Sequence, residues 1–170
     1  AIAFLSGKEP GRVPGLYLQL ARTPQARATA ENALRSGIDA LETQQAGLGD
    51  ESLRISFFDD SWSLFQDMVS LQLRAKNPAL AFEYSERSRA RSLLAATQRA
   101  QSSRTRSLSD IQSALPASVI LIYYATLADR VAMWTITSSN STLIERQMEE
   151  RELARLVEQH RESIRDHHER

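Results

Sequence analysis

Apolar residues recur every three or four positions through much of the first half of the chain, which is the spacing of one face of an α-helix. This pattern predicts a helix that begins at Thr23-Pro24 and stops before Gly47. It predicts a second helix after Asp59-Asp60-Ser61 and a third from about Pro78 to Thr97. Lys76-Asn77-Pro78 has the composition of a turn, so residues 61–97 are predicted to form a helical hairpin with a tight connection.

Two segments of this half lack a clear period. Glycines and prolines interrupt residues 1–22, and we expect an irregular N-terminal segment there. Residues 98–110 are rich in Ser and Arg, and we interpret them as a linker that separates a helical unit, residues 23–97, from a second unit, residues 111–170.

The second unit begins with a short predicted helix, Ile111–Leu115, which follows Ser109-Asp110 and ends at Pro116. The residue composition changes after this helix. β-branched and aromatic residues then predict strands. The predicted strands are Ser118–Tyr124, Val131–Thr137 and Ser141–Ile144. From about Met148 the pattern is helical again, with Leu153, Leu156, Val157 and Ile164 on one stripe. The fold class is therefore α+β.

The third predicted helix carries an unusual charge. Apolar residues between Ala79 and Leu94 share one arc of this helix, and Glu86 falls near its centre. A carboxylate that faces a core costs several kcal/mol unless it is paired, so the pattern predicts an arginine partner. The candidate partners are Arg89, Arg54 and Arg35. We favour a structural ion pair of Glu86 with Arg89 over a catalytic carboxylate, because no second carboxylate converges on this position.

A second stripe of the same helix is small throughout, and it permits the close approach of a neighbouring helix. Its members are Ala81, Ser85, Ser88 and Ser92.

Composition and charge narrow the classes of function. The chain has 21 basic and 21 acidic residues, so no net charge attracts nucleic acid or anionic lipid. The absence of cysteine excludes disulfides, thiolate metal sites and a Cys nucleophile within these 170 residues. The longest apolar run, Val119–Ala125, is the length of a strand rather than of a membrane span. We therefore expect a cytoplasmic protein with no membrane or nucleic-acid partner.

The histidine, serine, arginine and tryptophan residues that could carry other chemistry are better explained by structural roles. His160 and His167 are too far apart along a helix to share a metal, and we expect His160 to be a half-buried packing residue. No motif for a Ser nucleophile or a nucleotide is present, and we predict no catalytic, cofactor or metal residue. The basic residues Arg99, Arg104 and Arg106 are interpreted as a solvated linker, and Trp62 and Trp134 as core residues.

Several of these segments together resemble the CHAT family, the caspase-like domains associated with tetratricopeptide repeats. Ala79–Phe82 and Glu86–Leu94 resemble the last tetratricopeptide-type helix of that family, and Arg54–Phe58 with Leu64-Phe65 fits the preceding helix. Further segments resemble the entry into the caspase-like domain. These are Ile111-Gln112, Leu115-Pro116, Ile120–Tyr124 and Arg130–Thr137. The resemblance covers about residues 24–165.

The resemblance implies a tetratricopeptide-like antiparallel helical hairpin, followed by the first strands and helix of a caspase-like α/β domain. It implies a bacterial signalling protein whose repeats bind a protein partner and regulate a cysteine peptidase domain. The candidate residues of the interaction helix are Glu86, Arg87, Arg89 and Arg91. The catalytic His and Cys of active members have no counterpart here, and we expect them to lie beyond this chain. The alternatives are a degenerate scaffold member and a non-catalytic protein–protein interaction module; the oligomeric state stays open.

Overall fold

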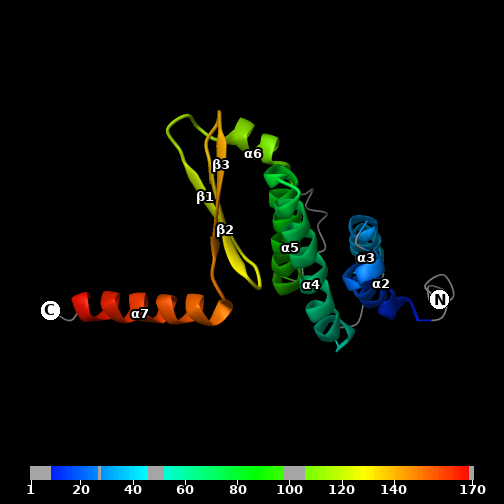
Figure 1. Cartoon of the computed structure of the whole chain (residues 1–170). Helices are drawn as coiled ribbons and strands as arrows, with labels where there is room; N and C mark the ends of the chain where they lie inside the picture. Colours follow the sequence, from blue (N-terminus) through cyan, green and yellow to red (C-terminus); the bar gives the residue numbers. More distant parts are fainter. Residues whose placement is uncertain (1–8, 27, 46–51, 98–105, 169–170) are drawn as a thin grey trace. The chain divides into compact units, whose positions relative to one another are not determined.

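The computed structural model of the chain describes residues 9–26, 28–45, 52–97 and 106–168 (Figure 1). The chain forms two compact units, Ala1–Arg106 and Ser107–Arg170, here called the helical unit and the sheet unit. The division falls within the predicted linker, of which residues 98–105 lie outside the described residues. The whole is a mixture of α-helices and a small antiparallel sheet, so the α+β class is confirmed.

The helical unit is built from helices that pack on their neighbours in the chain. Its elements are η1 (Pro10–Arg12), α2 (Val13–Arg22), η2 (Pro24–Ala26), α3 (Ala30–Gln45), α4 (Ser52–Arg74) and α5 (Pro78–Thr97). Helix α2 packs against α3 and α4, α3 packs against α4, and α4 packs against α5. The third predicted helix is confirmed. The first begins at Ala30 rather than at Thr23, and the second begins at Ser52 rather than after Ser61.

Helix α2 (Val13–Arg22) overturns the prediction of an irregular segment for residues 13–22, whereas residues 1–8 of that segment lie outside the described residues. Pro14 lies in the first turn, where its missing N–H leaves no hydrogen bond unmade. Val13 and Leu18 are buried at 4% and 6% exposure, so contacts with the other helices outweigh the low helix propensity of Gly15. The C-terminal end is closed by Thr23, whose amide and hydroxyl both donate to the Leu20 carbonyl oxygen.

The predicted tight connection between α4 and α5 is confirmed. Lys76 adopts φ of 58°, the left-handed conformation that allows a helix to end sharply. The Lys76 amide donates to the Leu73 carbonyl oxygen and the Asn77 amide to that of Gln72. The Leu80 amide donates to the side chain of Asn77, which caps the start of α5.

Among the described side chains of α5, residues 78–90, the buried face shares only Phe82 with the apolar arc that the sequence predicts; the arc residues Leu93 and Leu94 have side chains outside the described residues. The buried side of α5 is centred near Ala81, which is 0% exposed, together with Phe82 and Tyr84. Ala79, on the predicted arc, is exposed, and Glu86 is half-buried. Helix α5 packs against α4, and the face that it buries combines the small Ala81 with the large Phe82 and Tyr84.

Gly37 lies at a close contact of α3 with α2 and α4. A Cβ atom there would lie 2.8 Å from Leu64 Cδ2 of α4 and 3.0 Å from Tyr17 Cβ of α2. We expect Gly37→Leu to lower the free energy of unfolding by about 1–3 kcal/mol, because Leu64 is fully buried and cannot move aside. Urea denaturation followed by circular dichroism measures the change. The control is Asn32→Ala on the exposed side of α3, and equal midpoints for both variants would contradict the close packing.

The sheet unit begins with a capped helix. Its elements are α6 (Leu108–Ala114), β1 (Leu121–Thr126), β2 (Arg130–Ile136), β3 (Ser141–Gln147) and α7 (Glu150–His168). Ser107 and Asp110 form a capping box in which each side chain accepts from the other residue's amide, so α6 starts before the predicted Ile111. The side-chain Nε2 of Gln112 donates to the carbonyl oxygen of Thr137, the residue after β2, and connects α6 to that end of the sheet.

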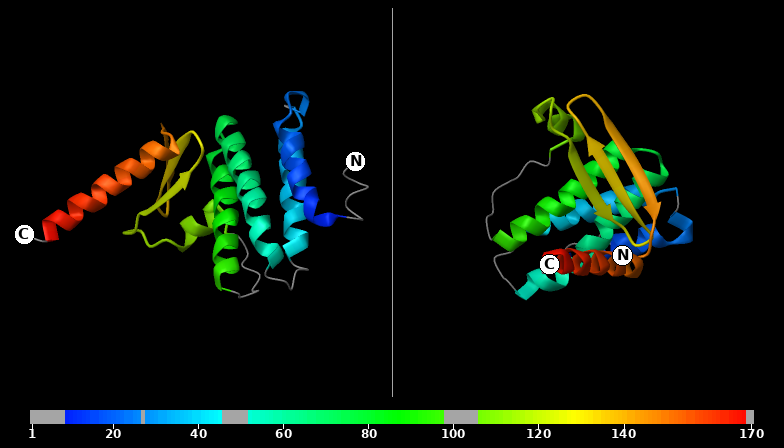
Figure 2. Two further views of the ribbon diagram at one scale, coloured as in Figure 1. Left: turned by 90° about the horizontal axis from the view of Figure 1, so that it is seen from below. Right: turned by 90° about the vertical axis from the view of Figure 1, so that its left-hand side faces the viewer.

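The strands form an antiparallel sheet in the order β1-β2-β3, and they lie side by side (Figure 2). The predicted strand types are confirmed, but β1 is shifted toward Thr126 and β3 extends to Gln147 instead of Ile144. One face carries buried residues, which are Tyr123, Ala125, Ala132, Trp134 and Ile136. The other face is called here the open face, because Ile122, Tyr124 and Ile144 on it are exposed.

Candidate functional site

The charged side chains of α3 and α5 meet around Tyr84, and we call this group the Tyr84 cluster. Arg87 Nη2 lies 2.9 Å from Glu42 Oε1, and the two side chains are 25% and 33% exposed. The Arg87 guanidinium also stands over the Tyr84 ring, with its Cζ 5.1 Å from the ring centroid. Arg87 therefore combines an ion pair with a cation–π contact, and both fix its side chain on the surface.

Arg35 completes the Tyr84 cluster from α3. Its Nη2 lies 2.8 Å from Glu31 Oε1, one helical turn away. Hydrogen bonding to Tyr84 raises the pKa of Arg35 above its ordinary value, and electrostatic attraction to Tyr84 and to Glu31 raises it further. Tyr84 itself is 5% exposed, so the Arg87 guanidinium stands over a buried ring, and Arg35 bonds to the same side chain. The arrangement can present fixed charges of both signs to a protein partner.

The predicted ion pair of Glu86 with Arg89 stays a prediction. Glu86 is half-buried and Arg89 is exposed, which places neither in the core. An ion pair of α5 is formed by the next residue, Arg87, with Glu42. Of the other candidate partners, Arg35 contacts Glu31, and the side chain of Arg54 lies outside the described residues. The side chain of Arg91, a predicted interaction residue, lies outside them as well.

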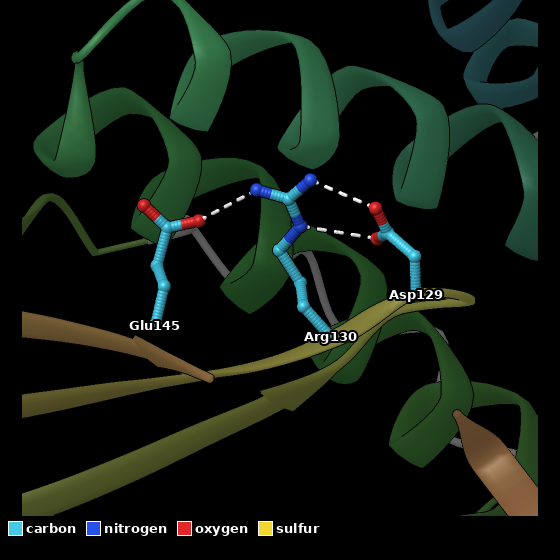
Figure 3. A network of polar contacts seen from close by, with 3 residues as sticks. All are labelled: Asp129, Arg130 and Glu145. Atoms are coloured by element: carbon cyan, nitrogen blue, oxygen red, sulfur yellow. Dashed lines mark hydrogen bonds and ion pairs between the residues drawn. The ribbon is translucent and has the colours of Figure 1, made fainter. Parts of the chain in front are cut away.

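A second group of charged side chains lies at the β1–β2 turn of the sheet unit. Arg130 donates through Nε to Asp129 Oδ1 at 3.0 Å and through Nη2 to Asp129 Oδ2 at 2.8 Å. Its Nη1 donates to Glu145 Oε2 at 3.0 Å, so the guanidinium lies between two carboxylates (Figure 3). These hydrogen bonds raise the pKa of Arg130 above its ordinary value. The arginine therefore stays charged and joins the turn to β3.

Sequence reasoning missed this network, because it began the second strand at Val131 and so left Arg130 outside the predicted sheet. The usable signal was the register: Arg130 pairs with Gln147 and Ala132 with Glu145, which places both charged side chains on one face. Finding it requires the strand pairing, and the predicted end of β3 at Ile144 left Glu145 outside the sheet.

We expect Arg130→Ala to lower the free energy of unfolding of the sheet unit by about 1–2 kcal/mol, because charge-assisted hydrogen bonds to two carboxylates are lost. The Arg130 side chain is 19% exposed, which limits its screening by water. Hydrogen exchange of the β2 and β3 amides measures the loss. The control is Arg146→Ala, an exposed arginine of the same sheet. Equal exchange rates in the two variants would show that the network contributes nothing.

A cleft of about 750 Å³ lies beside this network. It is lined by Ala128, Asp129 and residues 147–152, which carry more acidic than basic groups. Within the part of the chain that the structure describes, no group of His, Cys, Asp or Glu has the arrangement of a metal site. The geometry gives the cleft no catalytic assignment.

Two other expected roles are wrong. Trp62 is 50% exposed rather than a core residue, whereas the prediction for Trp134, at 1%, is confirmed. His160 is exposed rather than half-buried, because the apolar stripe of α7 on which it lies is itself exposed. His167 and His168 have side chains outside the described residues, as have Arg99 and Arg104.

Comparison with protein-family models, with curated proteins and with solved structures finds no match to this chain. Among the helices of the described residues, none combines the length and the apolar composition that crossing a membrane requires.

Proposed function

We propose that the helical unit binds a protein partner, and that the sheet unit is the start of a caspase-like domain of the CHAT type which this binding regulates. The proposal includes a bacterial parent protein and a cytoplasmic location. The observation that carries it is the division of the chain into a helical unit and a sheet unit between Arg106 and Ser107. This order agrees with the order of the segments that carry the family resemblance.

The Tyr84 cluster is the surface that we assign to the partner. Arg87 and Glu42 are partly exposed and held in place by each other and by the Tyr84 ring. Prearranged charged groups lose little side-chain entropy when they pair with groups of a partner. The other predicted interaction residues of this helix, Glu86 and Arg89, lie about 100° and 160° around the helix from Arg87 at 100° per residue, so the Tyr84 cluster includes neither.

The coding sequence beyond Arg170 provides the first test. A strand that ends in His-Gly, followed by a later strand that ends in Cys, supports a regulated cysteine peptidase. A complete reading frame without these residues would contradict the peptidase and favour a non-catalytic interaction or scaffold module. That outcome leaves the binding role of α5 intact, so the two parts of the proposal are separable.

A further inference from the structure

The open face of the sheet exposes a group of apolar side chains. Ile122 and Tyr124 of β1 are each 53% exposed, and Ile144 of β3 is 57% exposed. The register places Tyr124, Met133 and Ile144 opposite one another in one row across the three strands. A contiguous apolar surface of this kind is typical of a site that packs against another element.

Helix α7 exposes a second apolar surface. Leu156, Val157 and Ile164 are 37%, 50% and 48% exposed, and their spacing places them on one side of the helix. Glu158 and Glu162 fall on the opposite side by the same spacing. In the structure α7 leaves the end of β3 without lying along the sheet (Figure 1). A helix with one apolar stripe gains stability when that stripe is covered.

We propose that α7 docks on the open face of its own sheet and covers it as a hinged helical flap. Only Met148 and Glu149 separate β3 from α7, which is within the range of strand-to-helix connections in which the helix packs back on the sheet. The inference concerns the sheet unit alone and does not depend on the proposed function.

The dimensions of the two surfaces agree. Ile144 lies three residues before the end of β3, or about 10 Å at the rise of a strand. Val157 lies seven residues after the start of α7, which is also about 10 Å at the rise of a helix. A helix that folds back from the connection therefore brings Val157 over Ile144.

Charge also favours this occupant. Arg146 is exposed on the open face, in register with Val131, next to the connection. The first turn of α7 carries Glu150 and Glu152, which come near Arg146 when the helix folds back. A two-residue tether gives α7 a high effective concentration at its own sheet, and this favours the same chain over a second copy.

Engineered cysteines test the docking, because the natural chain contains none. We expect Ile144→Cys with Val157→Cys to form at least about ten-fold more intramolecular disulfide under mild oxidation than the control pair, Ile144→Cys with Glu158→Cys, since a disulfide forms only when the Cα atoms come within about 7 Å. Non-reducing electrophoresis separates the products. Cross-linked dimers would assign the open face to a second copy, and equal intramolecular yields would show that α7 stays undocked; either result overturns the proposal.

Limited digestion with trypsin tests the docking without cysteines. Arg155 and Arg161 lie within α7, and docking shields its backbone. We expect Ile164→Gln to raise the rate of cleavage in α7 several-fold, whereas Glu162→Gln, on the charged side, leaves it unchanged. Equal rates in both variants and in the natural chain would overturn the proposal.

Discussion

Replacing Trp134 with alanine is expected to abolish most of the stability of the sheet unit. The side chain is 1% exposed, and its ring meets that of Tyr123 edge-on, with centroids 5.8 Å apart. Loss of a buried Trp costs about 3–5 kcal/mol through lost burial and the cavity that remains. A unit of this size has a total stability of roughly 3–10 kcal/mol. Hydrogen exchange measured by mass spectrometry should therefore show β1, β2 and β3 losing most of their protection in Trp134→Ala.

Thr135→Ala is the matched control for this prediction. Thr135 is the next residue of β2, so its side chain points to the open face, and it is only half-buried. We expect it to change the stability by less than about 1 kcal/mol. If the two variants lost equal protection, the two faces of the sheet would not differ in the way that the structure describes.

The strands show how far sequence reasoning extends in the sheet unit. β-branched and aromatic residues correctly predicted three strands, because that composition suits a half-buried pleated surface. The predicted ends of the strands were wrong, because hydrogen bonding to the neighbouring strand decides where a strand ends. The Leu127 amide donates to the Arg130 carbonyl oxygen, so β1 continues to the turn through Thr126. β3 likewise extends to Gln147 because it pairs with Arg130, a long-range contact that composition does not encode.

The helical unit shows a different limit. The periodicity of the third predicted helix correctly gave its bounds, Pro78–Thr97, but placed Glu86 on its inner face. Summing apolar residues gives weight to Ala79 and Ala90, whereas the described part of α5, which packs against α4, buries Ala81, Phe82 and Tyr84. The Tyr84 cluster could not be predicted in full, because Glu42 and Arg87 lie on helices separated by α4 in the chain. Only Arg87 was among the predicted interaction residues.

Phe82→Ala is expected to lower the free energy of unfolding of the helical unit by about 3–5 kcal/mol, the cost of a cavity in place of a buried Phe. Phe82 is 0% exposed on α5, the helix that packs against α4. Denaturation in urea, followed by circular dichroism, measures the loss as a lower midpoint with an unchanged slope.

Glu86→Gln is the control for Phe82→Ala. It also tests which face of α5 is buried. Glu86 lies one turn after Phe82 and is half-buried, so removing its charge is expected to change stability by less than about 0.5 kcal/mol. If the packing of α4 sets the buried face, only Phe82→Ala has a large effect. A loss of several kcal/mol in Glu86→Gln would instead mean that this carboxylate faces the core with a buried arginine, since breaking such a pair leaves an uncompensated charge. Because Phe82 belongs to both faces, the effect of Glu86→Gln decides whether the buried face of α5 includes Glu86.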